Sequence, residues 1–242
     1  MALQTTGPIS HSDVQGEFGG TNPISLSEYY SAATGVPATG NPISLSDFYG
    51  TANTVTFTYE LIGGGGGGGR GLDGGTGGAR GGSGGTSTIA SSEFTTITAS
   101  GGVGGRSGIY RPGTNASNVA GDASYYGAGG TAGSDTSSTN NRGGNAPSSS
   151  YGAGGGGGGG DFSNSKIDST GYRGEGGYAS TRITGTETVV SGTTISITIG
   201  GAGAGTSSGQ HSGGNGAAGF AKITVDGVAT NFTSSGTMTL TS

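Results

Sequence analysis

The stretch that decides the fold is 54–71, TVTFTYELI followed by GGGGGGGRG. In its first half, Val55, Phe57, Tyr59 and Leu61 alternate with threonines and one glutamate. Alternation with a period of two predicts a strand that is buried on one face. The second half is an unbroken glycine tract. A half-buried strand therefore leads directly into a segment that has almost no side chains.

Further strands are expected on both sides of the glycine-rich part of the chain. In 193–199, Ile195, Ile197 and Ile199 share one face. Weaker patterns occur at 86–99, 179–190, 219–225 and 236–240. Because strands bracket the glycine region, we expect a small β-structured base that closes the chain at both ends. The glycine tracts themselves cover 63–69, 74–85, 101–108, 127–133, 154–160, 171–177 and 200–219.

The composition is typical of a disordered chain, because 61 of 242 residues are glycine and only 29% are hydrophobic. If the tracts are ordered, something other than a side-chain core must hold them, and there is no cysteine to form disulfides. The tracts have no collagen register. Extended helices of the polyproline II type could pair their outward-pointing N–H and C=O groups, and only glycine allows such close approach. We therefore expect a mostly irregular/β fold: a bundle of packed polyglycine II helices on a small β base, with an N-terminal repeat appendage.

An internal repeat occupies residues 1–53. The string Pro-Ile-Ser-x-Ser-Asp/Glu occurs three times and begins at Pro8, Pro23 and Pro42. In each copy the serine after isoleucine is placed to cap a helical turn, and the acid three residues later is placed to reach back to it. Three solvated turns in a linker are the alternative, but we favour an attachment module, because a spacer has no need of a repeated anchor. The docking candidates are Ile9, Ile24, Leu26, Tyr29, Ile43, Leu45 and Phe48.

Several classes of protein are disfavoured by simple counts. The net charge is −5, with Lys and Arg scattered singly, so we expect no nucleic-acid partner. No segment approaches the roughly 20 apolar residues of a membrane helix, so we expect no membrane insertion. The first residues, MALQTTGPISHSD, lack a basic stretch followed by an apolar run, which predicts synthesis in a cytoplasm without a signal peptide.

Catalytic motifs are weak throughout the chain. There are two histidines and no cysteine, and no G-x-S-x-G is followed by an acid and a histidine. The first tract ends in Gly69-Arg70-Gly71, where a phosphate loop needs Gly-Lys-Ser/Thr. The six residues 68–73 match the start of a calcium-binding β-roll repeat, but the apolar residue it needs next is replaced by Gly75. No acid pair stands out as that of a glycosidase. We expect no enzyme, no cofactor and no metal.

Binding is expected in the segments that interrupt the glycines, which are 109–126, 134–151, 161–172 and 206–213. They alternate with the tracts, so a bundle would bring several of them to one end. Their Tyr, Ser, Asn and Gly composition is that of binding loops. For a tyrosine next to a tract, the alternative is a cap over the bundle. The candidate contacts are Tyr110, Arg111, Tyr125, Tyr126, Asn140, Asn141, Tyr151, Phe162, Lys166 and His211.

Three parts of the sequence resemble the glycine-rich domains of phage tail proteins: TVTFTYELIGGGGGGGRG, YGAGGGGGGGD, and TTISITIGGAGAG with GGNGAAGFAKITV. In particular they resemble the adhesins at the tip of the long tail fibres of T-even-like phages. The resemblance covers about 54–225, leaving 226–242 as a C-terminal strand segment and the Pro-Ile-Ser repeats outside it. It implies a sandwich of polyglycine II helices with receptor-contacting loops at the distal end, on a virion made in a host cytoplasm.

The resemblance implies that the receptor is a host surface protein or glycan. Residues 1–53 lie outside the resemblance, and as an attachment module they are expected to bind a tail protein such as a fibre, which is commonly trimeric. We therefore expect a tail-fibre tip adhesin. The alternatives are a structural virion connector or spike, and an ice-binding protein, which would want a flat, regular, threonine-rich face. The variable composition of the interrupting segments favours the adhesin.

Overall fold

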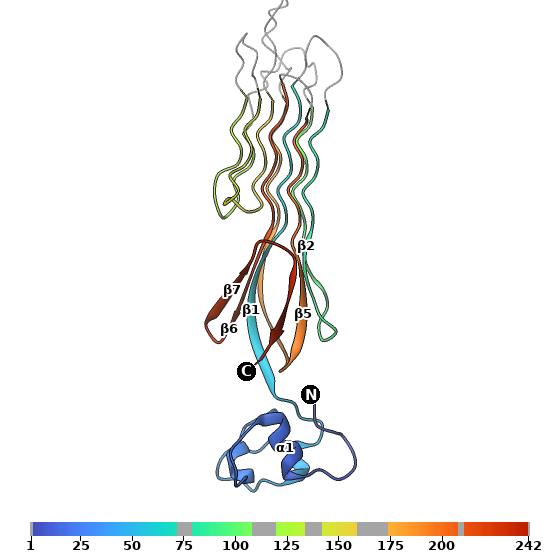
Figure 1. Cartoon of the computed structure of the whole chain (residues 1–242), viewed down its shortest axis with the longest axis vertical. Coiled ribbons are helices and arrows are strands. Elements are labelled where there is room, and N and C mark those ends of the chain that lie inside the picture. The colour runs from blue at the N-terminus through green and yellow to red at the C-terminus, as the bar shows by residue number, and fades with distance from the viewer. Residues whose placement is uncertain are drawn as a thin grey trace, which may run out of the picture.

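The computed structural model describes residues 2–71, 79–107, 120–133, 142–158, 174–207 and 211–241. These residues form an elongated molecule with three parts along its axis (Figure 1). A compact unit made of residues 2–53 lies at one end, two β-sheets lie in the middle, and glycine-rich segments extend to the other end.

Two antiparallel four-stranded sheets make up most of the regular structure. The first has the order β4-β1-β6-β7 and consists of β4 (Arg182–Val190), β1 (Thr54–Ile62), β6 (Phe220–Val225) and β7 (Val228–Phe232). The second has the order β3-β2-β5-β8 and consists of β3 (Ile97–Ala99), β2 (Ser87–Ala90), β5 (Thr193–Thr198) and β8 (Gly236–Leu240). The residues from 226 onward therefore add one strand to each sheet.

The two sheets share one hydrophobic core. Val55, Phe57 and Leu61 of β1 pack in the same cluster as Ile195 and Ile197 of β5. The alternation expected for 54–62 is confirmed, because these inward side chains are buried while the threonines between them are exposed. The same holds for 193–199, where the isoleucines face inward.

The expected fold class is wrong. The described residues form a β-rich molecule with two antiparallel four-stranded sheets and one α-helix, not a small β base that carries a bundle of polyglycine II helices. The sequence interpretation undercounted the strands: 86–99 holds both β2 and β3, and β7 was not expected. β2, β3 and β7 are only three to five residues long, so each offers little apolar alternation from which a strand could be predicted.

Six strands continue into glycine-rich segments of extended backbone that run side by side (Figure 1). The segment 63–71, which follows β1, donates its N–H groups to three neighbouring segments in rotation. The donor–acceptor pairs are Gly64 to Gly85, Gly65 to Ala217, Gly66 to Tyr178, and then Gly67 to Gly82, Gly68 to Gly214 and Gly69 to Glu175, at 2.8–3.0 Å. Its carbonyl groups accept from three other segments, through the N–H groups of Gly102, Gly203 and Gly155.

Side chains have no room inside this packing. A Cβ added at Gly65 would overlap the carbonyl group of Ala153, and one added at Gly66 would overlap that of Val103. Both glycines are buried. Because the obstacles are backbone atoms that are themselves hydrogen-bonded, they have little freedom to move aside. The backbone is therefore the core of this part of the molecule.

The N-terminal unit is built from the three repeats. It contains α1 (His11–Phe18) and two 3-10 turns, η1 (Leu26–Tyr29) and η2 (Leu45–Phe48). All three capping boxes are confirmed, and their serine–acid pairs are Ser10–Asp13, Ser25–Glu28 and Ser44–Asp47. Hydrogen bonds from Ser10 lower the pKa of Asp13. One ring from each repeat meets the other two, because the centroids of Phe18, Tyr29 and Phe48 lie 6.0–6.3 Å apart.

Candidate functional site

The first candidate site is the end of the glycine-rich segments farthest from the N-terminal unit (Figure 1). Five stretches of chain, 72–78, 108–119, 134–141, 159–173 and 208–210, lie outside the described residues. The described residues on either side of them are joined by backbone hydrogen bonds of 2.9–3.0 Å, from Arg70 to Ala79, Gly71 to His211, Gly143 to Ser212, Gly158 to Gly69, Gly174 to Gly158, and Glu175 to Arg106. We call the described residues within two positions of these stretches the distal end. All five stretches therefore leave from and return to one hydrogen-bonded end of the molecule.

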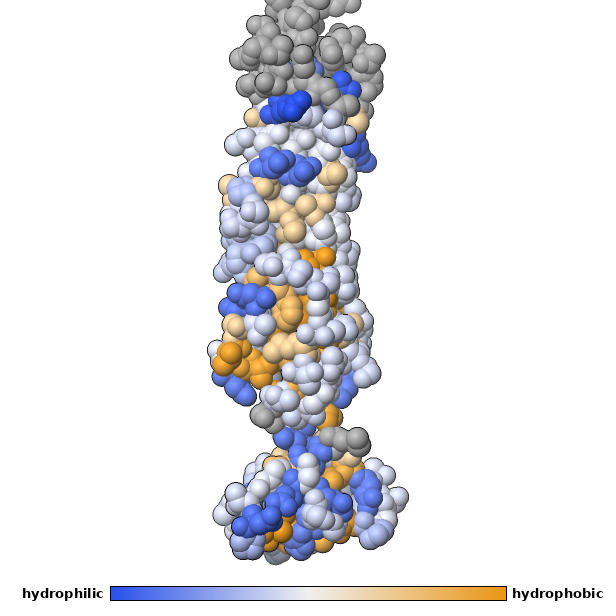
Figure 2. All heavy atoms as spheres, in the orientation of Figure 1, coloured by the Kyte–Doolittle hydropathy of each residue, from blue (hydrophilic) through white to orange (hydrophobic). Residues whose placement is uncertain are grey.

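The distal end carries positive charge. Its charged residues are Arg70, Arg80, Arg106, Arg142 and Glu175, which give four positive charges and one negative charge, a formal sum of +3. Figure 2 shows strongly hydrophilic side chains at this end of the described part. By sequence, the five stretches outside the described residues add three cations and four aspartates, so the formal charge of this end remains positive at +2.

The N-terminal unit has the opposite charge. Residues 2–53 contain Asp13, Glu17, Glu28 and Asp47 and no lysine or arginine, a formal sum of −4 with neutral histidine. The chain as a whole has a net charge of −5. The distal end therefore favours an anionic partner, and the N-terminal unit favours a cationic one.

The residues expected to bind a receptor are divided between different parts of the chain. Six of them lie outside the described residues: Tyr110, Arg111, Asn140, Asn141, Phe162 and Lys166. Leu72 and Asp73 of the partial calcium motif also lie outside them. His211 lies at the distal end, where it is buried and its Nδ1 has no hydrogen-bond partner among the described residues.

The remaining three, Tyr125, Tyr126 and Tyr151, contact residues of the first sheet instead. Tyr125 and Tyr126 occupy the centre of a tight turn, in which the N–H of Ser124 donates to the carbonyl of Gly127 at 2.9 Å and the N–H of Gly127 donates back at 3.3 Å. The hydroxyl of Ser124 also accepts the N–H of Tyr126 at 3.2 Å. The turn holds two adjacent aromatic rings in fixed positions.

Tyr126 and Tyr151 pack on the end of the first sheet. The ring of Tyr151 stacks on Phe220 with centroids 4.7 Å apart, and Tyr126 lies 5.6 Å from Tyr151 and 5.3 Å from Phe220. Phe220 pairs across the strands with Ile62, which is also buried. Much of the ring area of Tyr126 and Tyr151 is thereby used in packing.

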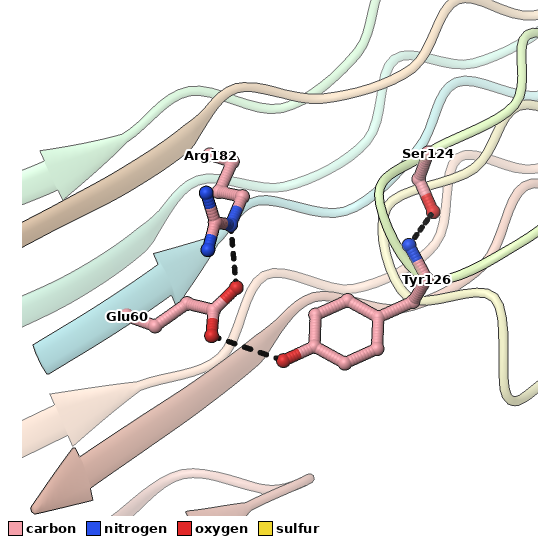
Figure 3. A network of polar contacts seen from close by, with 4 residues as sticks. All are labelled: Glu60, Ser124, Tyr126 and Arg182. Atoms are coloured by element: carbon pink, nitrogen blue, oxygen red, sulfur yellow. Dashed lines mark hydrogen bonds and ion pairs between the residues drawn. The ribbon is translucent and has the colours of Figure 1, made fainter.

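A short polar network fixes the position of Tyr126 (Figure 3). Glu60 of β1 accepts a hydrogen bond from the Tyr126 hydroxyl at 3.1 Å and pairs with the Nε of Arg182 on β4 at 2.5 Å. Burial, and then the hydrogen bond to the Glu60 carboxylate, raise the pKa of Tyr126 to about 12. The same carboxylate raises the pKa of Arg182. Glu60 therefore connects the aromatic turn to the sheet.

Tyr125 differs from its neighbours in its exposure. The guanidinium carbon of Arg182 lies 4.0 Å from the centroid of its ring, and the ring of Tyr126 meets it nearly at right angles, 5.4 Å away. Even so, 71% of Tyr125 is exposed. The cation–π contact and the turn hold this ring in place while most of it faces solvent.

An open depression of about 380 Å³ lies on the outer face of the same sheet, next to Glu60. It is lined by two rows of side chains that cross β4, β1 and β6, with Tyr59 and Gly185 paired between them. The rows are Thr186–Thr58–Thr224 and Thr184–Glu60–Lys222. The outer face of the second sheet also carries threonine rows, for example Thr98–Thr88–Thr198, and threonine is a favoured residue at exposed strand positions.

The docking candidates pack within the N-terminal unit. Tyr29 and Phe48 are core side chains that are 3% and 0% exposed. The other five are half-buried against the same cluster: Ile9, Ile24, Leu26, Ile43 and Leu45. Only this second group offers any surface to a partner.

The strand residues around Tyr126 and the depression form a second candidate site, which sequence reasoning missed. Glu60, Arg182 and Lys222 come from β1, β4 and β6, whereas receptor-binding candidates were sought only in the segments that interrupt the glycines. Their one sequence signal is a charge at an outward position of a threonine-rich strand. No group of metal-binding side chains and no helix long and apolar enough to cross a membrane occurs among the described residues. Comparison with protein-family models, characterised proteins and solved structures found no match.

Proposed function

We propose that this chain is a receptor-binding adhesin at the tip of a phage tail fibre, and that it contacts the host surface at its distal end. The proposal starts from the resemblance of 54–225 to such adhesins. One structural observation supports it most: five chain stretches start and finish at one end of a rigid, hydrogen-bonded backbone. Binding residues are commonly carried on loops that a rigid scaffold positions.

The charge of the two ends supports the same proposal. Bacterial surfaces are rich in phosphate and carboxylate groups, and arginine forms bidentate hydrogen bonds with both. A sum of +3 among the described residues of the distal end would attract such a surface and speed up association. The negatively charged N-terminal unit would be repelled from it and left free to attach to the fibre.

The proposal is tested by labelling cells. We expect the fluorescently labelled full chain to bind a subset of a panel of bacterial strains. We expect the double variant Tyr110→Ala/Arg111→Ala to bind at least about 30-fold more weakly, as for a hot spot that contributes about 2 kcal/mol, with an unchanged melting temperature. A matched control is Tyr178→Ala, which removes a 47%-exposed tyrosine from the side of the molecule. Labelling should also weaken as salt screens the arginines.

Two results would count against this function. One is a panel in which no strain is labelled above the level of an unrelated protein that carries the same dye. The other is specific labelling that the double variant leaves unchanged and that salt does not weaken. Either result would favour the structural connector or spike.

A further inference from the structure

We propose that Tyr125 and the depression lined by Glu60 form a second binding site, for an uncharged carbohydrate, on the side of the molecule. Glu60 joins the two parts, because it lines the depression and pairs with the arginine on which Tyr125 lies. The site is formed by the first sheet and the 124–127 turn. It therefore includes none of the residues of the distal end and does not depend on the function proposed for them.

Tyr125 has the properties of a platform for a sugar ring. Sugars present a face of C–H groups that packs on aromatic rings, and tyrosine offers rigid amphipathic area with few rotatable bonds. One face of the Tyr125 ring lies on the guanidinium of Arg182, and 71% of the residue is exposed, so the opposite face is open. Tyr126 holds the ring from the side. An exposed ring fixed by two contacts needs little reorganisation to bind a ligand.

The depression offers the polar half of such a site. Its threonine hydroxyls each donate and accept hydrogen bonds, as sugar hydroxyls do. The three strands that carry them lie about 4.8 Å apart, so the hydroxyls of one row are spaced regularly. The depression is open to solvent and has a volume of about 380 Å³, so a sugar would lie across the threonine rows with one side exposed.

The charges in the depression favour a ligand without net charge. Glu60 and Lys222 are cross-strand partners of opposite sign, and Glu60 is already paired with Arg182. An added anion would compete with the Glu60 carboxylate for Arg182, and an added cation would compete with Arg182 for Glu60. A neutral, hydroxyl-rich molecule can bond to the threonines and Lys222 without breaking the Glu60–Arg182 pair.

The second sheet provides an internal control. Its outer face has comparable threonine rows, but neither a charged residue nor an aromatic ring lies in the row Thr98–Thr88–Thr198. If threonine rows alone bound sugar, both faces would do so. The proposal requires the platform, and so it assigns binding to the first sheet only.

The test is an array of uncharged oligosaccharides of mannose, glucose, galactose and N-acetylglucosamine, probed with the full chain. We expect binding to at least one of them, reduced at least 10-fold by Tyr125→Ala and retained by Tyr125→Phe. Thr184→Val should weaken the same signal, whereas Thr198→Val, its counterpart on the second sheet, should leave it unchanged. All three residues are outside the hydrophobic core, and melting curves of the four variants check that each remains folded.

Three outcomes overturn the proposal: no binding to any uncharged glycan, binding that persists in Tyr125→Ala, or binding confined to sialylated or phosphorylated glycans added to the array. The Tyr110→Ala/Arg111→Ala variant changes no strand residue of either sheet, and we expect it to bind the array normally. Loss of cell labelling and loss of glycan binding are therefore separate results. The second can fail while the proposed function stands.

Discussion

The hydroxyl group of Tyr126 is held in its protonated form by its surroundings. Its pKa is about 12 in the folded protein, against an ordinary value of 10.0. Between these values the unfolded chain has lost the proton and the folded chain retains it. The stability that this group contributes is therefore fully present below about pH 10 and is lost as the pH rises through about 12.

This behaviour is measurable by NMR. With tyrosine labelled at the ring carbon that bears the hydroxyl, the signal missing from Tyr126→Phe identifies the residue. We expect that signal to titrate near pH 12, and Glu60→Gln to shift the titration to lower pH, because it removes the carboxylate charge that opposes ionisation. Titration near pH 10 in the unaltered protein would show that Tyr126 is not held by Glu60 in solution.

Single residues also show where the sequence stops being informative about the site. The sequence identified Tyr125 and Tyr126 as candidates because they interrupt the glycines. It gave no reason to connect Tyr126 with Glu60, which lies 66 positions away, or with Arg182. The Glu60–Arg182 pair arises from the way β1 and β4 are aligned, and the Tyr126–Glu60 contact arises from the way the 124–127 turn packs on the sheet; no local pattern encodes either.

At the scale of the elements, the glycine-rich segment 63–69 has no room for side chains. At Gly65 an added methyl group would meet a hydrogen-bonded backbone, while Gly201, in another glycine-rich segment, has open space around it. We expect Gly65→Ala to lower the free energy of unfolding by about 1–3 kcal/mol or more, as overpacking does. Gly201→Ala should be neutral or slightly stabilising, because it restricts the unfolded chain.

The pair of variants is compared by chemical denaturation. Both exchange glycine for alanine in extended backbone, so they share the change in chain entropy and differ in the space around the new methyl group. Equal unfolding free energies for the two would mean that the neighbouring segments are not in close contact at Gly65.

The elements also differ in how well the sequence predicted them. β1 was predicted with the correct limits because its alternation is strong. β7 was missed, although Asp226 and Gly227 lie between two strand-like stretches and have φ values of 48° and 79°. An Asp-Gly pair with positive φ is a strong signal for a hairpin turn. That signal was available, whereas the lateral pairing of the glycine-rich segments has no signature in any one of them.

At the scale of the whole molecule, the N-terminal unit combines three similar elements in one chain. The three serine–acid caps surround a group of three rings, and Ile9, Ile24 and Ile43 remain half-buried at its surface. A fibre with three-fold symmetry presents one surface three times. We predict that a single copy of this chain caps such a trimer through the three repeats.

The mass of the intact complex checks this stoichiometry. Native mass spectrometry of the isolated fibre tip should give one copy of this chain for three copies of its partner. The variant His11→Leu makes the first repeat resemble the other two, which carry Leu26 and Leu45, and should bind the partner more tightly. A mass equal to three copies of each chain would rule out the cap and indicate a trimer of this protein.

The rotation of hydrogen bonds along 63–71 restricts how the length of the molecule can change. Every third N–H group of this segment donates to the same neighbour. For example, Gly64, Gly67 and Arg70 all donate to the segment 79–86. Inserting one or two residues would direct the following donors at the wrong neighbours, whereas inserting three would restore the order. A longer or shorter relative should therefore differ in steps of three residues, made in all the adjoining segments together, much as a reading frame tolerates only whole codons.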